Sequence, residues 1–196
     1  MTVEIRHTTT EAKMISSFLL AEISSTRFTQ LVMDSIVTHG RSKELVENPD
    51  LNDQEENIVR KNVLMDYRGH YFSGFPMDVE WNSGQLMTEE IARLKTINFD
   101  YWLNFSDNTR SLAVIANKIR SGIQYKSESN DIFYQIAEAL GKSETEPVIL
   151  VGENLDELVI LEGHFRLLAH LLQDNQDRII PTIIGFSKNI SNWALY

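Results

Sequence analysis

A histidine and an arginine follow a glycine in residues 162–166, which read Glu-Gly-His-Phe-Arg. Residues 157–161 before them are an apolar run typical of a strand, and residues 167–172 after them are strong helix formers. The spacing therefore predicts that a strand ends and a helix begins at Gly163. Backbone N–H groups at a helix start lack partners, so cationic side chains placed beside them favour a phosphate site.

A structural interpretation of the same residues stays open beside this one. In it, Arg166 pairs with a nearby carboxylate, for which Glu162 is a candidate, and His164 is a surface residue. The two interpretations differ in what Arg166→Ala would do. A phosphate-binding arginine at a helix start is mildly unfavourable without its ligand, so its loss should spare the fold and weaken binding. A structural arginine should instead be needed for stability.

A second polar cluster, residues 106–110, contains Arg110 and precedes an apolar helical pattern. Residues 97–105 before it alternate between apolar and polar, which predicts a strand with one buried face. Asp107 or Asn108 is a good N-cap for the following helix, and capping is the structural interpretation of the cluster. The functional interpretation is a second helix start with an arginine in its first turn.

The remaining elements follow from periodicity and from helix caps. Helical spacing runs from residue 8 to 39, with a break near Ser24 and Ser25, and again from 53 to 68. The rest is predicted as a loop at 41–53, an ordered aromatic and glycine-rich loop at 69–87, a short helix after Thr88, a helix at 130–140 closed by Gly141, and strands at 147–151 and 179–184. Pro181 would confine part of the last strand to a sheet edge.

The order strand, hairpin, strand, Gly-x-x-Arg turn, helix and Ile-Pro strand resembles the ParB/sulfiredoxin-like superfamily over residues 146–187. The resemblance extends more weakly back to about residue 96, and residues 1–70 have no recognised counterpart. In that superfamily the Gly-x-x-Arg turn binds nucleotide phosphates. Sulfiredoxin chemistry is excluded because the chain has no cysteine. ParB proteins carry Gly-Glu-Arg-Arg in the turn, whereas kinase-like members often have histidine there.

The resemblance implies a nucleotide-binding protein, an ATP-dependent phosphotransferase or NTPase. Gly163, His164 and Arg166 would hold the phosphates, and Arg110 with Ser106 and Thr109 would form a second clamp. His164, Glu162 and Glu80 are the candidate catalytic residues, and one of the two carboxylates would hold Mg²⁺ or act as general base. The alternatives are a non-catalytic nucleotide-binding or regulatory module and a ParB-like DNA-associated protein.

Composition limits these alternatives. The 196 residues and their 42% apolar content fit one compact unit with an ordinary globular core. The order of the predicted elements makes it an α+β fold, with a helical part at 1–70 and, as the resemblance implies, a ParB/sulfiredoxin-like part at 71–196. A formal net charge of −10 disfavours nucleic acid as a partner but not a small anionic ligand. The sequence has no apolar run long enough to span a membrane and no secretory signal pattern, so we expect a cytoplasmic protein.

Overall fold

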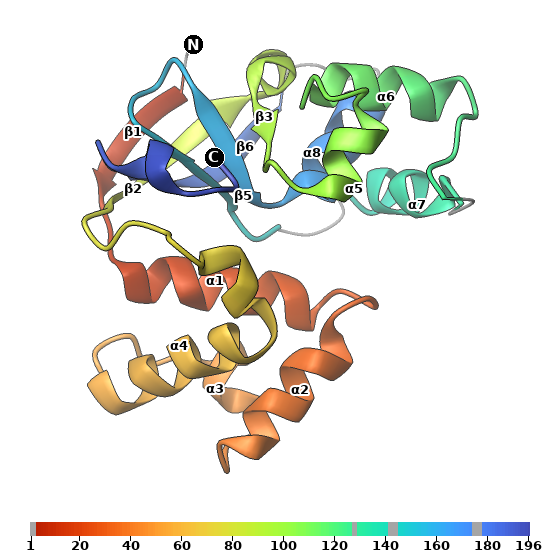
Figure 1. Cartoon of the computed structure of the whole chain (residues 1–196). Coiled ribbons are helices and arrows are strands. Elements are labelled where there is room, and N and C mark those ends of the chain that lie inside the picture. Colours follow the sequence, from red (N-terminus) through yellow and green to blue (C-terminus); the bar gives the residue numbers. More distant parts are fainter. Residues whose placement is uncertain (1–2, 127–128, 141–144, 174–177) are drawn as a thin grey trace.

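The computed structural model describes residues 3–126, 129–140, 145–173 and 178–196. There the chain forms a mixed sheet with helices packed on it, which confirms the predicted α+β fold (Figure 1). The strands are β1 Val3–Thr8, β2 Glu80–Met87, β3 Lys95–Thr96, β4 Val148–Gly152, β5 Leu158–Glu162 and β6 Ile179–Phe186. The α-helices are α1 Glu11–Ile23, α2 Thr29–Thr38, α3 Glu44–Glu47, α4 Gln54–Arg68, α5 Asp100–Phe105, α6 Leu112–Arg120, α7 Asp131–Ala139 and α8 His164–Leu172. Short 3-10 helices are η1 Gly69–Phe72, η2 Thr88–Arg93 and η3 Ile190–Asn192.

The described strands lie in the order β1-β2-β6-β4-β5-β3. β4 runs parallel to β6 and β3 runs parallel to β5, whereas the other neighbouring pairs are antiparallel. β1 and β2 are neighbours in the sheet although α1–α4 separate them in the chain. The backbone N–H of Thr9 donates to the carbonyl of Trp81 at 2.8 Å, so the pairing continues one residue beyond β1.

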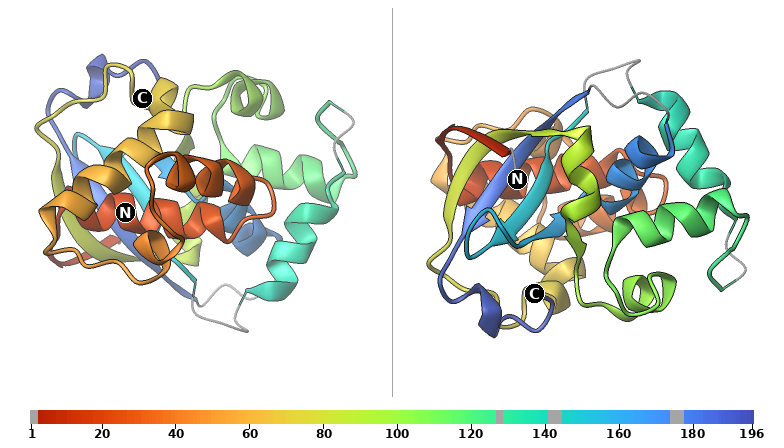
Figure 2. Two further views of the ribbon diagram at one scale, coloured as in Figure 1. Left: turned by 90° about the horizontal axis from the view of Figure 1, so that it is seen from below. Right: turned by 90° about the horizontal axis from the view of Figure 1, so that it is seen from above.

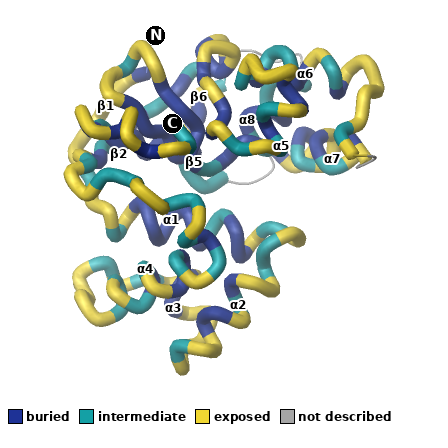
Figure 3. Tube along the Cα trace, in the orientation of Figure 1, coloured by how far each residue is buried: buried dark blue, intermediate teal, exposed yellow. Residues whose placement is uncertain are grey.

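Helices α1–α4 form a layer against one face of the sheet, as the views from below and above also show (Figure 2). α1 lies nearest the sheet, and its residues Met14, Phe18 and Leu19 are buried. In Figure 3 much of α1 is buried, whereas exposed residues collect at the outer loops of the helical layer. The buried side chains of α1, α2 and α4 belong to the same apolar core as those of β4, β5 and α8. The helical layer and the sheet therefore share one core.

The sequence predicted the carboxyl-terminal part of the fold well. Two strands, a helix and a third strand follow one another from β4 to β6, with Gly163 at the start of α8. β6 pairs with β4 only from Thr182 onwards, whereas Pro181 lies opposite Gln85 of β2. Pro181 thus occupies a stretch with one neighbouring strand, as its missing N–H requires. The predicted helices at 8–39, with their break near Ser24, and at 53–68 are also confirmed.

The strand predicted at residues 97–105 is wrong. The short strand β3 ends at Thr96, just before this segment, and the segment itself forms helix α5 from Asp100 onwards. Trp102 and Phe105 are buried, and Tyr101 packs edge-on against Phe105 with ring centroids 6.1 Å apart. Residues four apart meet on one face of a helix. Periodicity alone does not separate helix from strand in a short apolar run. In this segment the side chains that are buried or pack together are three and four residues apart, which is the spacing of a helix.

Other segments are more regular than the sequence predicted. The aromatic segment at 69–87 packs as expected, since Phe75 meets Trp193 with ring centroids 5.1 Å apart, but it also contains η1 and β2. The predicted loop at 41–53 contains α3, and the amino-terminal part supplies the unpredicted edge strand β1. Gly141, the predicted C-cap of α7, lies outside the described residues. Within the described ranges, no helix combines the length and apolar character needed to cross a membrane.

Candidate functional site

Arg110 is held in place by a tightly hydrogen-bonded loop between α5 and α6. The hydroxyl of the fully buried Ser106 accepts the backbone N–H of Arg110 at 2.8 Å. The hydroxyl of Thr109 donates to the carbonyl of Ser106 at 2.6 Å. The backbone of Arg110 in turn accepts the N–H of Thr96 at 3.0 Å. Ser106 and Thr109, which the sequence placed beside a phosphate, therefore bind backbone groups and position Arg110.

The loop backbone is unusual because Asp107, Asn108 and Arg110 have φ values of 54°, 61° and 60°. This left-handed region is disfavoured for residues with a side chain, and asparagine and aspartate tolerate it best. The predicted cap at Asp107 or Asn108 is wrong, since α6 begins at Leu112 and these two residues lie in the loop before it. The N-cap of α6 is Ser111, whose hydroxyl accepts the backbone N–H of Val114 at 3.4 Å.

The guanidinium of Arg110 is fixed at two of its three nitrogens. Nε donates to the carbonyl of Thr96 at 2.7 Å, and Nη1 donates to the backbone oxygen of Tyr196 at 2.6 Å. Nη2 is buried and has no hydrogen-bond partner among the described residues. Burial lowers the pKa of Arg110, and the nearby Tyr196 and Glu157 partly offset that effect. An arginine remains charged in proteins, so a buried cationic donor is left without an acceptor.

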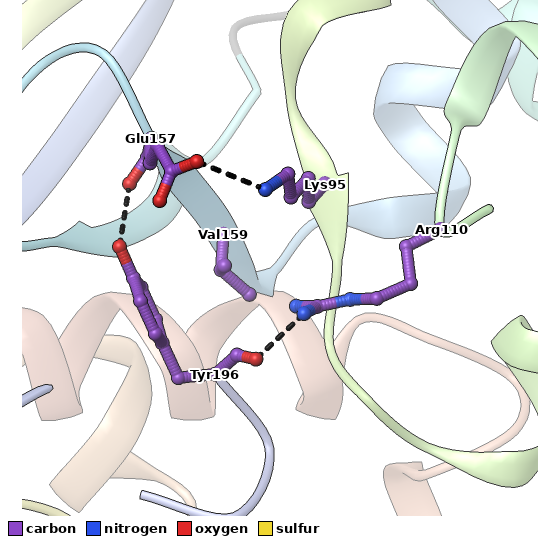
Figure 4. Close-up of a pocket in the computed structure, with 5 residues that line it drawn as sticks. All are labelled: Lys95, Arg110, Glu157, Val159 and Tyr196. Carbon is purple, nitrogen blue, oxygen red and sulfur yellow. Dashed lines mark hydrogen bonds and ion pairs between the residues drawn. The ribbon is translucent and has the colours of Figure 1, made fainter. Parts of the chain in front are cut away.

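This guanidinium lines a pocket of about 230 Å³ together with Lys95, Glu157, Val159 and Tyr196. Figure 4 shows Lys95 and Arg110 approaching from one side, with Glu157 and Tyr196 on the other. The ammonium of Lys95 lies 3.3 Å from a carboxylate oxygen of Glu157, and the hydroxyl of Tyr196 donates to the backbone carbonyl of Glu157 at 2.9 Å. The side chains lining the pocket thus include two cations and one carboxylate, an arrangement suited to an anionic group.

At the Gly163 turn, the principal anion site predicted from the sequence, the charged side chains are already paired with each other. Gly163 has φ 103°, and a Cβ there would lie 2.7 Å from Cγ1 of Val148, so the turn requires glycine. Arg166 forms an ion pair with Glu162 and donates to the backbone carbonyls of Glu146 and Pro147. The structural alternative for Arg166, pairing with Glu162, is therefore the arrangement observed.

His164 is only 7% exposed, so the alternative that made it a surface residue is wrong. Its ring stacks on Trp102 at a centroid distance of 4.6 Å, and its Nε2 accepts the backbone N–H of Ile97 at 3.4 Å. Burial lowers the pKa of His164 to about 3, and the positive charges of Arg110 and Arg68 add to the effect. The imidazole is thus neutral at pH 7 and packed into the core.

The two predicted carboxylates lie far apart. Burial raises the pKa of Glu162, and its partner Arg166 opposes the shift. Glu80 is exposed at the start of β2, and the strand register places it level with Leu158, at the opposite end of β5 from Glu162. Three strand spacings, roughly 14 Å, separate β2 from β5. The structure does not bring Glu80 together with the Gly163 turn.

The two arginines also have different surroundings. The described hydrogen bonds of Arg110 go to Thr96 and Tyr196, whereas those of Arg166 go to residues 146, 147 and 162. These contacts do not bring the two arginines together, so they do not support a single phosphate clamp formed by both. Within the described residues, no group of three or more histidine or acidic side chains is placed to hold a metal ion.

Lys95, Glu157 and Tyr196 were not predicted as site residues. Parallel pairing places Lys95 opposite Val159, and so brings it close to Glu157, which is 62 residues away in sequence. Tyr196 reaches Arg110 across 86 residues. Helical and strand periodicities carry information about neighbours within one element, so no local signal marks these contacts.

No family model matches the chain. No curated protein and no solved structure matches it either. The resemblance over residues 146–187 therefore remains a prediction.

Proposed function

We propose that the chain binds the phosphate groups of a nucleotide in the pocket between Lys95 and Arg110. The observation that carries the proposal is the buried Nη2 of Arg110, which has no partner in the described part of the chain. A buried donor without an acceptor costs about 1 to 3 kcal/mol, and more when it is charged. A phosphate oxygen would satisfy this nitrogen with a charge-assisted hydrogen bond once the guanidinium turns to present it to the pocket.

The surroundings of Arg110 support an anion in particular. Lys95 adds a second cation, and its exposed pair with Glu157 is of a kind that contributes about 0 to 1 kcal/mol. A ligand oxygen could therefore replace Glu157 beside Lys95 at little cost. The loop holding Arg110 has three left-handed residues, and strained backbone of this kind clusters at ligand-binding sites.

The volume of the pocket limits which part of a nucleotide it encloses. Pockets that enclose a whole drug-sized ligand measure about 300 to 1,000 Å³. A pocket of about 230 Å³ is smaller, so it suits the phosphate end of the ligand, with the sugar and base lying outside. The Gly163 turn is the competing location that the resemblance implies. There a phosphate would have to displace Glu162 from Arg166.

Calorimetric titration with ATP, GTP, CTP and pyrophosphate tests the proposal and separates the two locations. Arg110→Gln should weaken binding roughly ten- to a hundredfold, because a charge-assisted contact is lost. Arg110→Lys keeps the charge but not the fork of donors, so it should restore binding only in part. Arg120→Gln is the matched control, since Arg120 is exposed and also bonds a backbone carbonyl, that of Leu171.

Two results would overturn the proposal. One is that none of these ligands binds the unaltered protein. The other is that Arg166→Gln abolishes binding while Arg110→Gln retains it, which would place the phosphates at the Gly163 turn. Measuring phosphate release or transfer in the same samples separates an NTPase or phosphotransferase from a binding module.

A further inference from the structure

Glu157 is the carboxylate among the residues that line the pocket. It lies just before β5, and its side chain is 63% exposed. Its Oε1 lies 3.3 Å from the ammonium of Lys95, and its Oε2 has no described hydrogen bond or ion pair. The backbone carbonyl of Glu157 accepts the hydroxyl of Tyr196, so the residue is anchored by its main chain while its carboxylate stays available.

This carboxylate creates a charge problem for the proposed ligand. The polyphosphate of a nucleotide carries several negative charges, and a carboxylate on the wall opposite Arg110 would repel them (Figure 4). Lys95 brings one positive charge, which a phosphate and Glu157 would have to share. A cation placed between the phosphate and Glu157 would attract both and so remove this repulsion.

We infer that the phosphate enters this pocket with a divalent cation of the Mg²⁺ type, and that Glu157 is the protein ligand of that cation. The inference rests on the proposed function. Mg²⁺ keeps several waters and is bound in nucleotide sites by one or two carboxylates together with phosphate oxygens. A single carboxylate facing the phosphate-binding cations fits that pattern.

Glu157 satisfies the requirement better than the two carboxylates predicted from sequence. Glu162 is engaged by Arg166 and lies at the far end of β5. Glu80 lies three strands away on β2. Glu157 shares the pocket with Arg110, so a cation bound to its Oε2 would lie next to a phosphate on Arg110.

The test compares nucleotide affinity with excess Mg²⁺ and with a chelator, in the unaltered protein and in Glu157→Gln. Calorimetry would use ATP, or whichever nucleotide of the panel binds. The unaltered protein should bind the Mg²⁺ complex about tenfold more tightly than the free nucleotide, the ratio expected for one charge-assisted ligand. In Glu157→Gln this ratio should fall close to one, because metal-free binding tightens as the repulsion is removed and the Mg²⁺ complex binds more weakly.

Glu153→Gln is the matched control, since Glu153 is exposed in the same hairpin and does not line the pocket. It should keep the Mg²⁺ preference of the unaltered protein. The inference is overturned if Glu157→Gln keeps that preference unchanged, or if it weakens binding equally with and without Mg²⁺. Absence of nucleotide binding under both conditions would instead refute the proposed function, so the two failures are distinguishable.

Discussion

The buried histidine at the start of α8 makes a quantitative prediction about acid stability. His164 is 7% exposed, stacks on Trp102 and accepts a hydrogen bond from the backbone of Ile97. Its pKa is lowered to about 3, mainly by burial, from an ordinary value of 6.5. The folded protein therefore holds the neutral ring while the unfolded chain takes up a proton below pH 6.5. Stability is fully present above that pH and is lost as the pH falls toward 3.

The size of the loss follows from linkage. Each pH unit between the two pKa values removes about 1.4 kcal/mol, so near pH 4.5 the loss from His164 is roughly 3 kcal/mol. His164→Phe preserves the stacking on Trp102 and cannot bind a proton. At pH 7 the variant should be less stable by about 1 to 3 kcal/mol, because the N–H of Ile97 loses its acceptor.

Urea denaturation of both proteins at pH 7 and near pH 4.5 measures the difference. The unaltered protein should lose about 3 kcal/mol more than His164→Phe between the two conditions. His170, whose pKa is also lowered, to about 4, is present in both proteins and cancels in the comparison. Equal acid sensitivity of the two proteins would refute the reasoning. It would mean that His164 is protonated in the folded state and that the start of α8 is open to water.

Two further predictions concern the Gly163 turn. Arg166→Gln should destabilise the fold by about 2 to 4 kcal/mol, because Glu162 loses the partner of its ion pair. Chemical denaturation should show that adding Glu162→Gln to this variant recovers part of the lost stability. An unchanged stability for Arg166→Gln would instead support the phosphate interpretation. Gly163→Ala should cost at least about 2 kcal/mol, because φ is 103° and the new Cβ would meet Val148; a melting temperature equal to that of the unaltered protein would contradict this account of the turn.

The sequence predicted elements whose signals are local. The strand before Gly163 and the helix after it were identified because apolar spacing and a turn glycine act within a few residues. The ion pair of Arg166 with Glu162 was one of the two interpretations left open, because it too depends on a local feature: residues four apart meet at such a turn. The choice between the two required burial and partners that spacing does not contain.

The pocket as a whole could not be predicted from the sequence. Arg110 was identified, but its left-handed backbone was not, because arginine does not favour a positive φ and the Asp107-Asn108 pair before it favours one less strongly than glycine does. Lys95 reaches Glu157 only because β3 and β5 pair in parallel. β3 has only two residues, Lys95 and Thr96, which is too short to give a periodic signal in the sequence.

The separation of β1 from β2 by the whole helical layer has a consequence for folding kinetics. A hairpin between adjacent antiparallel strands closes over a few residues, but here the chain must close a loop of roughly 70 residues, at an added entropic cost of about 2 to 3 kcal/mol. Pairs so distant in sequence form late, whereas β4, β5, α8 and β6 are joined by short connections. β1 should therefore dock after the rest of the sheet has formed, and its amide hydrogens should exchange with solvent before those of β4 and β5.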